Sequence, residues 1–513
     1  MGIIKRLEAS IPARHRSRTR AGTGYAAAEF SRLTASLLSE SQYINTTLRY
    51  QLRTLRARSR QASQNNPFGK RFVQMVADNV FGPTPFRLQA KAKFKNGRLD
   101  TSANDKIETA YRRWGAVGEC EVTGRWSWNT MQRLIGRILP TDGEVLIRKI
   151  EGGDTRFGYQ LQLIDVDRLD EQKNQKLSDG SVINMGIEMD AVSRPLAYHV
   201  LKRKPASWDR GYVREYERIP ADEMFHLFVP DFAEQARGVP WMYAALLNLV
   251  HLGAFEEAAV IAARVGASKM GFFTSPDGDP GALADSKDAT TGDFYDEVDP
   301  GQFGTLPPGY GFTGYDPSYP DAAVEPFIKA CLRGVSAGLG VSYHNLANDL
   351  EGVNYSSARI GELSERDMWK GLQTFMVDHL HQPLYEDWLP IQVIRGNIAL
   401  PLSAGGALAL DKYRDVTWQP KRWAWTDPLK EVNANILAID NKLKSRTRVI
   451  AEQGEDVEDV FDELSQEEQM AKDKNLSLAK PVTTAPANGG GKPNGDTPND
   501  DEEKPDGEEE RQD

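Results

Sequence analysis

Cysteine is nearly absent: the 513-residue chain contains only Cys120 and Cys331. The two lie far apart and neither belongs to a C-x-x-C pair, so the sequence offers no disulfide framework and no cysteine-based zinc site. We therefore expect a chain suited to a reducing compartment, in which both cysteines are small buried apolar residues.

We also expect no enzyme chemistry from the sequence motifs. The glycine-rich stretch 301–314 lacks the G-x-x-x-x-G-K-[ST] pattern that cradles nucleotide phosphates, so the chain should not hydrolyse ATP itself. No nucleophile elbow is expected. His379 and His381 are two residues apart and would point in different directions on a helix, which is poor geometry for one metal ion. We expect no catalytic residue, no metal and no cofactor.

Long uncharged apolar runs are absent as well. The most apolar stretch, 244–267, carries His251, Glu256, Glu257 and Arg264, whereas a membrane span needs roughly 20 nearly uncharged residues. The N-terminus lacks the apolar core of a secretory signal. We therefore expect no membrane partner.

The charge that is present is unevenly distributed. The net charge is −10, yet residues 1–60 contain twelve Lys or Arg against three Asp or Glu, and residues 481–513 contain ten acidic against three basic residues. Such blocks are usually solvated. The basic arm is suited to contact nucleic acid, and the acidic tail is not.

Between these ends the sequence pattern indicates a mixed α and β protein of several structural units. Helical spacing runs over 26–62, is broken at Asn66-Pro67, and resumes to Phe81. Strand-like segments separated by turn residues follow up to residue 229. Long helices are predicted from Pro240 to Val265, from Pro326 to Ala337 and from Ser356 to Leu380. The predicted class is α+β and multidomain.

Two residue patterns suggest alternative activities. Asp165 and Asp167 follow an apolar run, and carboxylates at a strand end can hold the divalent metal of a nuclease. A polar strand terminus is the simpler interpretation. Basic residues beside aromatic ones, as in Arg112-Arg113-Trp114, can bind nucleic acid by charge and stacking, although such pairs are more often packed surface elements.

One region resembles a known family. The run Leu332–Tyr343, with "LR" followed by "AGLGVSY", precedes "NDLEGVNYSSAR" at 348–359, and this combination is similar to the lambda-type portal proteins of tailed bacteriophages. Further likeness lies around Asp78–Gly82, Arg237–Trp241 and Trp418–Glu431. The resemblance covers roughly residues 30–470, leaving the basic arm and the acidic tail outside it.

The resemblance implies a portal fold with a mixed α/β wing, a helical stem, a small α/β clip and a helical crown. Mapped onto this chain, the expected units are a basic arm 1–24, wing 25–237, stem helix 238–266, clip 267–320, second stem helix 321–343, tunnel loop 344–355, long helix and late wing 356–427, crown 428–470 and acidic tail 471–513.

The implied function is that of a ring of about twelve subunits at one capsid vertex, through which double-stranded DNA is packaged and ejected without sequence specificity. The implied partners are the terminase large subunit, head-tail connector proteins, the major capsid protein and a scaffold. The implied location is the portal vertex of the virion, with the host cytoplasm during assembly. Another virion adaptor and a nuclease using Asp165 and Asp167 stay open as alternatives.

A conduit must not grip DNA, because many phosphate contacts would bind too tightly. A ring of twelve such chains would carry roughly −120 charges and repel DNA along most of its lining. Lys329, Arg333 and Arg359 would either form sparse basic rings in the tunnel or pair with neighbouring acids. The resemblance implies neutral polar DNA contacts in or beside the tunnel loop, from Tyr343, Asn345, Asn348, Asn354 and Tyr355.

Overall fold

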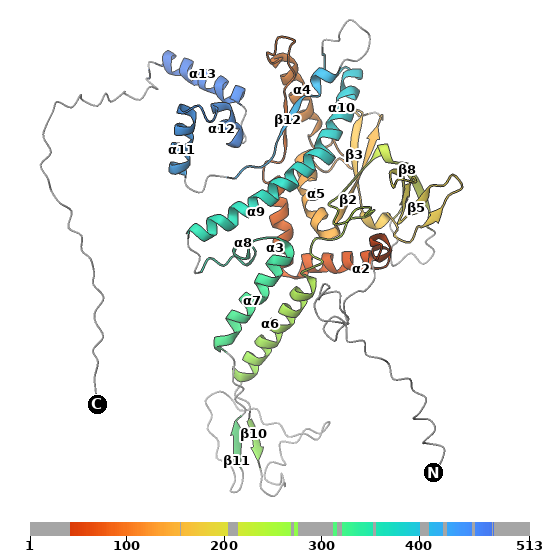
Figure 1. Cartoon of the computed structure of the whole chain (residues 1–513), viewed down its shortest axis with the longest axis vertical. Coiled ribbons are helices and arrows are strands. Elements are labelled where there is room, and N and C mark those ends of the chain that lie inside the picture. The colour runs from red at the N-terminus through yellow and green to blue at the C-terminus, as the bar shows by residue number, and fades with distance from the viewer. Residues whose placement is uncertain are drawn as a thin grey trace, which may run out of the picture.

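The computed structural model describes most of the chain between residues 42 and 476 (Figure 1). The described ranges are 42–153, 155–203, 214–267, 271–274, 311–314, 321–351, 355–400, 410–423, 428–453, 457–474 and residue 476. The expected basic arm, most of the expected clip and nearly all of the acidic tail lie outside them.

The first described elements confirm the helical pattern and its break. Helix α2 spans Ile44–Asn65 and helix α3 spans Pro67–Val76, continued by a π-helical turn over Ala77–Phe81. The side chain of Asn66 accepts hydrogen bonds from the amides of Phe68 and Gly69, both at 3.0 Å, and Pro67 occupies the first helical position. The Asn-Pro pair thus ends one helix and caps the next.

The main core is built from helices packed on small sheets. Helices α4 (Thr101–Trp114) and α5 (Trp128–Asp142) precede a three-stranded antiparallel sheet of order β3-β2-β9. Its strands are Glu144–Glu151 (β2), Tyr159–Ile164 (β3) and Met224–Phe228 (β9). A second pairing joins β1 (Arg87–Ala90) to β12 (Val416–Gln419), so the C-terminal part closes onto the N-terminal part.

A five-stranded antiparallel sheet forms its own layer beside this core. Its order is β4-β5-β6-β7-β8, and its longest strands are β7 (Pro195–Leu201) and β8 (Tyr216–Pro220). The shorter strands are β4 (Gln175–Lys176), β5 (Val182–Asn184) and β6 (Ile187–Met189). A separate apolar cluster that includes Ile187, Tyr198 and Ile219 lies beneath it. The strands expected between residues 144 and 229 are therefore confirmed, with 182–189 divided into a hairpin.

One buried carboxylate connects these layers. The side chain of Glu144, at the start of β2, is 0% exposed and contacts Arg56 of α2, His226 of β9 and Arg237. Arg237 Nε lies 2.9 Å from Glu144 Oε2, and the amide of Gly238 donates to the same oxygen at 3.1 Å. Burial alone would raise the pKa of Glu144, but the charge of Arg237 and the hydrogen bond from His226 lower it well below the ordinary range.

Glycines allow the chain to approach this cluster closely. Gly143 has a φ of +85°, and a Cβ there would lie 2.2 Å from the carbonyl carbon of Val239. A Cβ on Gly238 would lie 2.1 Å from the carbonyl oxygen of Gly143. Both contacts are with backbone, so neither position accepts a side chain.

Two antiparallel helices project from the core (Figure 1). Helix α6 spans Leu246–Ala267, and α7 spans Asp321–Leu339. Strands β10 (Gly271–Thr274) and β11 (Gly311–Gly314) pair beyond their far ends. The rings of Phe255 and Phe327 meet between the helices with centroids 4.7 Å apart. These are the elements expected as stem helices and as part of the clip.

Several predicted helix boundaries were wrong. The helix expected from Pro240 begins at Leu246, because the Trp241 amide bonds to the Pro140 carbonyl and holds 240–245 in turns. Helix α5 continues past Pro140 to Asp142, although a proline inside a helix usually ends or kinks it. Helix α7 ends at Leu339, and Gly340 adopts a φ of +70° before the next element.

The third long helix is also longer than predicted. Helix α9 (Tyr355–Met376) continues through a π-helical turn, Val377–His381, into α10 (Gln382–Ile394). Three further helices follow, α11 (Pro428–Asp440), α12 (Arg446–Gln453) and α13 (Val457–Asp473). Helix α13 therefore extends across the boundary at 471 where the acidic tail was expected to begin.

His381 is a core residue of this long helix. Its side chain is fully buried and stacks on Phe86, with ring centroids 4.3 Å apart, next to Trp128 and Trp418. Neither ring nitrogen has a hydrogen-bond partner among the described residues. Burial lowers the pKa of His381 to about 3, so the ring is neutral in the folded chain.

We predict that Glu144→Gln destabilises the fold by about 3–5 kcal/mol, because it leaves the buried guanidinium group of Arg237 without a counter-charge and removes one of the three carboxylates around Arg56. Chemical denaturation followed by tryptophan fluorescence would measure the change. Glu217→Gln is the matched control, because Glu217 pairs with Arg148 at the surface and should cost less than about 1 kcal/mol. Equal effects of the two substitutions would contradict the role of Glu144.

We predict that His381→Phe flattens the dependence of stability on pH between about 3 and 6.5. In the wild type the unfolded chain binds a proton on His381 in this window and the folded chain does not, so stability falls as pH falls, by up to about 1.4 kcal/mol per unit. Denaturation midpoints across this pH range would measure the slope. His379→Phe, at an exposed position, should leave the slope unchanged, and an unchanged slope in His381→Phe would contradict the account.

Candidate channel site

The residues expected near a tunnel gather where α7 turns toward α9. Ser342 caps a short helix, α8 (Tyr343–Ala347), and Asn348 follows with left-handed φ and ψ of 53° and 35°. The expected loop 344–355 is therefore partly helical at both ends, since α9 begins at Tyr355. We call residues 342–351 the α8 segment.

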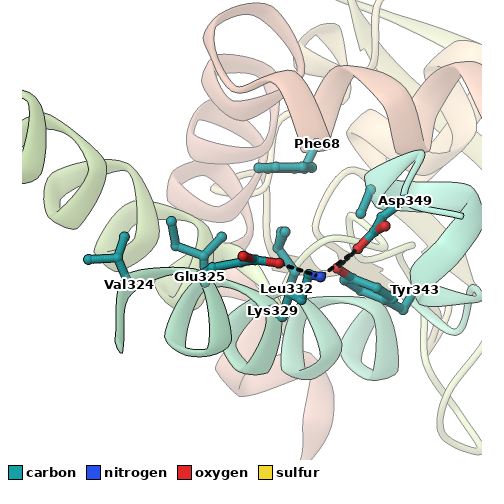
Figure 2. A pocket seen from close by; sticks show the side chains of 9 residues that line it. Phe68, Val324, Glu325, Lys329, Leu332, Tyr343 and Asp349 are labelled. Carbon is teal, nitrogen blue, oxygen red and sulfur yellow. Dashed lines mark hydrogen bonds and ion pairs between the residues drawn. The ribbon is translucent and has the colours of Figure 1, made fainter. Parts of the chain in front are cut away.

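A single lysine holds the α8 segment against α7. Lys329 Nζ lies 2.6 Å from Glu325 on its own helix and 3.6 Å from Asp349 (Figure 2). It also lies 3.1 Å from Glu351. Hydrogen bonds to Glu325 and Glu351 raise the pKa of Lys329 above its ordinary value. The sequence left two alternatives open for Lys329, a basic ring in the tunnel or pairing with neighbouring acids. In the single chain Lys329 is paired with acids.

Tyr343 makes a contact within the same segment. Its hydroxyl donates to Asp349 Oδ2 at 2.7 Å, and this bond lowers the pKa of Asp349. The guanidinium carbon of Arg333 lies 5.6 Å from the centroid of the Tyr343 ring, a cation–π distance. Lys329, Arg333 and Tyr343 are thus brought together, as their proximity in the motif suggested.

The amide side chain of Asn345 serves the fold. Its Nδ2 donates to Glu365 Oε2 at 2.9 Å, and the backbone carbonyl of Asn345 accepts from Arg71 Nε at 3.3 Å. Asn348 is exposed at its helix end. Tyr355 and Arg359 lie in the first turns of α9, and their side chains, like the whole of Asn354, lie outside the described residues.

The α8 segment closes one side of an open pocket of about 440 Å³. Figure 2 shows Phe68 of α3 facing Leu332, Lys329 and Tyr343 across it. We call Lys329 and its partners Glu325, Asp349 and Glu351 the Lys329 cluster. Apart from Lys329, Glu325, Asp349 and Tyr343, the residues that line the pocket are apolar: Phe68, Val324, Ile328, Leu332 and Ala347.

Sequence reasoning missed the acidic partners in this site. Glu325 lies four residues before Lys329, a spacing that favours an ion pair on a helix, so that signal was available. Glu365, which accepts from Asn345 and from the amide of Ser342, gave no local signal. The pattern G-x-S-x-G also occurs, at Gly334–Gly338, but in the middle of α7, where buried Ser336 donates to the Leu332 carbonyl; it is not a strand-to-helix elbow.

The carboxylates of the nuclease alternative contact arginines. Arg60 reaches Asp167 at 2.6 Å and Asp165 at 3.3 Å, and Arg56 reaches Asp167 at 3.0 Å. Within the described residues, no group of three or more His, Cys, Asp or Glu side chains is arranged to hold a metal ion. The geometry is that of ion pairs between α2 and the end of β3.

Comparison with known proteins finds phage portal proteins among the sequences similar to this chain. The "Probable portal protein" of Halomonas phage phiHAP-1 is 35% identical over 435 residues, covering 84% of this chain and 83% of the relative. "Portal protein B" of Escherichia phage lambda is 21% identical over 439 residues, covering 79% and 81%. A solved structure described as "Neck of empty GTA particle computed with C6 symmetry" covers 79% of this chain and 94% of its own at 14% identity, with a TM-score of 0.44.

A family model described as "Phage portal protein, lambda family" matches residues 30–373. The chain belongs to the lambda family of phage portal proteins. This confirms the resemblance drawn from the "AGLGVSY" and "NDLEGVNYSSAR" motifs. The family is structural rather than enzymatic.

We predict that Lys329→Met loosens the α8 segment without unfolding α7, because Asp349 and Glu351 lose their cation. Backbone amides of residues 345–351 should exchange hydrogen several-fold faster, as measured by mass spectrometry. Lys370→Met is the matched control, since Lys370 pairs with Asp367 on exposed α9 and should leave the segment unchanged. Unaltered exchange in Lys329→Met would show that the ion pairs do not hold the segment.

Proposed function

We propose that the chain assembles into a ring of about twelve subunits at one capsid vertex and forms the channel for DNA packaging and ejection. The ring would dock the terminase large subunit during packaging and head-tail connector proteins afterwards, within a shell made of the major capsid protein on a scaffold. Family membership supports the class of function, and the surface of α6 supports the assembly.

Helix α6 is the observation that carries the proposal. Residues Leu246–Arg264 are long and apolar enough, by length and composition, to cross a membrane, yet only 17% of this window is buried within one chain. Leu247 and Val250 are 68% and 65% exposed, and Val260 and Ile261 are about half exposed. So large an apolar surface on a helix marks an interface.

Copies of the same chain are the partner that this surface favours. Glu256 and Glu257 lie in the middle of the helix, where a bilayer would be unfavourable for charge. A helix that exposes apolar residues along its length needs neighbours to cover them, and a closed ring supplies such neighbours through one repeated head-to-tail contact.

Charge supports a channel that does not retain DNA. The chain is acidic overall, and Lys329, a cation near the expected tunnel, is already surrounded by three acids. Few cations are then available for phosphates, which favours sliding over binding. ATP hydrolysis would reside in the terminase motor, since this chain has no phosphate loop.

We predict that Val250→Glu prevents ring assembly while leaving the chain folded, because it places a charge on the surface that neighbours must cover. Mass photometry should show wild-type particles near twelve subunits, roughly 690 kDa from the 57.2 kDa chain mass, and monomers for the variant. Val192→Glu is the matched control, since Val192 is 81% exposed and lies in the turn between β6 and β7 of the five-stranded sheet. Rings of Val250→Glu with unchanged stability would contradict the proposed role of α6.

A further inference from the structure

A second pocket, of about 400 Å³, lies far from the α8 segment. It is bounded by α4, by the turn between β2 and β3, and by the residues that follow α10. Lys106, Arg113 and Arg156 line it, with Phe157 and Ile398 among its apolar residues. Arg113 belongs to the basic-aromatic motif that the channel function leaves unexplained.

No described acidic side chain forms an ion pair with the cations of this pocket. Lys106, Arg113 and Arg156 are exposed, and none makes an ion pair with another described residue. Asp105 is the one acid among the lining residues. Elsewhere in the described chain, arginines such as Arg56, Arg60 and Arg218 are paired with carboxylates, so the pocket is a local excess of positive charge.

The pocket is held in shape by bonds to the backbone around it. Arg395 donates to the carbonyls of Thr155 and Gly153 at 2.8 and 3.0 Å, and Gln392 donates to that of Phe157 at 3.0 Å. The Trp114 indole donates to the Tyr159 carbonyl at 2.8 Å, which fixes α4 against β3. Binding here would therefore require little ordering of the turn.

A concave pocket lined by cations and apolar residues favours a carboxylate-bearing protein segment over duplex DNA. Guanidinium groups pair well with carboxylates, and apolar residues in a pocket accommodate an apolar side chain. A duplex presents phosphates on a convex surface, so it would contact the exposed cations at the rim without entering the pocket. The fitting ligand is an acidic helix or peptide with at least one exposed apolar side chain.

Helix α13 of this chain has that chemistry. It contains seven acidic residues and one basic residue, and Phe461 and Leu464 are each about half exposed. Glu468 lies on the same helical face as Phe461 and Leu464, with Glu467 beside it. Neither Glu467 nor Glu468 makes an ion pair with a described residue.

We propose that α13 of one subunit docks into the cationic pocket of the neighbouring subunit. This inference rests on the proposed ring. Figure 1 shows α13 and α4 at the same end of the molecule, opposite to β10 and β11. A rotation about the long axis therefore brings the helix of one copy to the level of the pocket of the next, and the same contact repeats around a closed ring.

Charge reversal tests the pairing in the assembled protein. Arg113→Glu/Arg156→Glu reverses the charge of the pocket, and Glu467→Arg/Glu468→Arg reverses the charge of this part of α13. Each should raise the concentration at which rings half-dissociate by about tenfold, and the combination should return it to within about threefold of wild type. Lys176→Glu/Arg194→Glu is the control, because it reverses two exposed cations in and beside the five-stranded sheet. It should leave the concentration at which rings dissociate unchanged. If the combined variant dissociates at least as readily as either charge reversal alone, the proposed pairing is wrong.

A second measurement does not depend on the ring. A fluorescent peptide of residues 457–473 should bind the full-length Glu467→Arg/Glu468→Arg chain saturably, and adding Arg113→Glu/Arg156→Glu should abolish binding. Binding without any wild-type rings would refute the ring and leave the pairing supported. Absence of binding, or displacement of the peptide by duplex DNA at lower concentration than by unlabelled peptide, would overturn the assignment of the pocket.

The identity of the donor subunit is tested by crosslinking. Chains with Thr109→Cys, at the pocket, and chains with Leu464→Cys are mixed and oxidised. Crosslinked dimers joining the two kinds of chain are expected. A chain that carries both substitutions and closes a disulfide only within itself would show that α13 folds back onto its own pocket, which would overturn the neighbour contact.

Discussion

The buried carboxylate of Glu144 is the interaction on which the arrangement of this protein depends. It receives Arg56 from the N-terminal helix, His226 from a neighbouring strand, and Arg237 together with the Gly238 amide from the segment that leads into α6. A carboxylate that is 0% exposed stays charged only because these donors surround it. The contacts of Glu144 therefore fix the segment that leads into α6. The close approach of the Gly143 and Gly238 backbones leaves no space for a side chain at either position.

The core therefore buries its apolar residues within one chain, whereas the projecting helix α6 does not. The aromatic residues around Trp114, Trp388 and His381 are fully buried within one chain, whereas α6 exposes leucine and valine along its length. The proposed ring resolves this difference, because neighbours would supply the cover that one subunit lacks. The Lys329 cluster then has a positional role, since it ties the α8 segment to α7 and so to whatever surface α7 presents in the assembly.

Much of the fold was predictable from local pattern. The Asn66-Pro67 break, the strands between 144 and 229 and the long helices follow from short-range spacing and capping, and the structure confirms them. The motif around "NDLEGVNYSSAR" identified the family, which the family match confirms. Errors arose where tertiary contacts override local signals: Pro140 is accommodated inside α5, and the Trp241 amide is drawn to the Pro140 carbonyl, which delays the start of α6. The Glu144 cluster was beyond prediction, since its arginines lie 88 and 93 residues away in sequence. Lys329 and Glu325 are four residues apart and could have been paired, but Glu365 reaches Asn345 only through the fold.

Electron microscopy of the purified full-length chain in negative stain tests the central claim most directly. The account predicts rings with an axial hole and with α6 and α7 buried between subunits. Compact single particles without a hole, persisting at high protein concentration and with added scaffold protein, would contradict it. They would mean that the exposed apolar surface of α6 is covered by something other than copies of this chain.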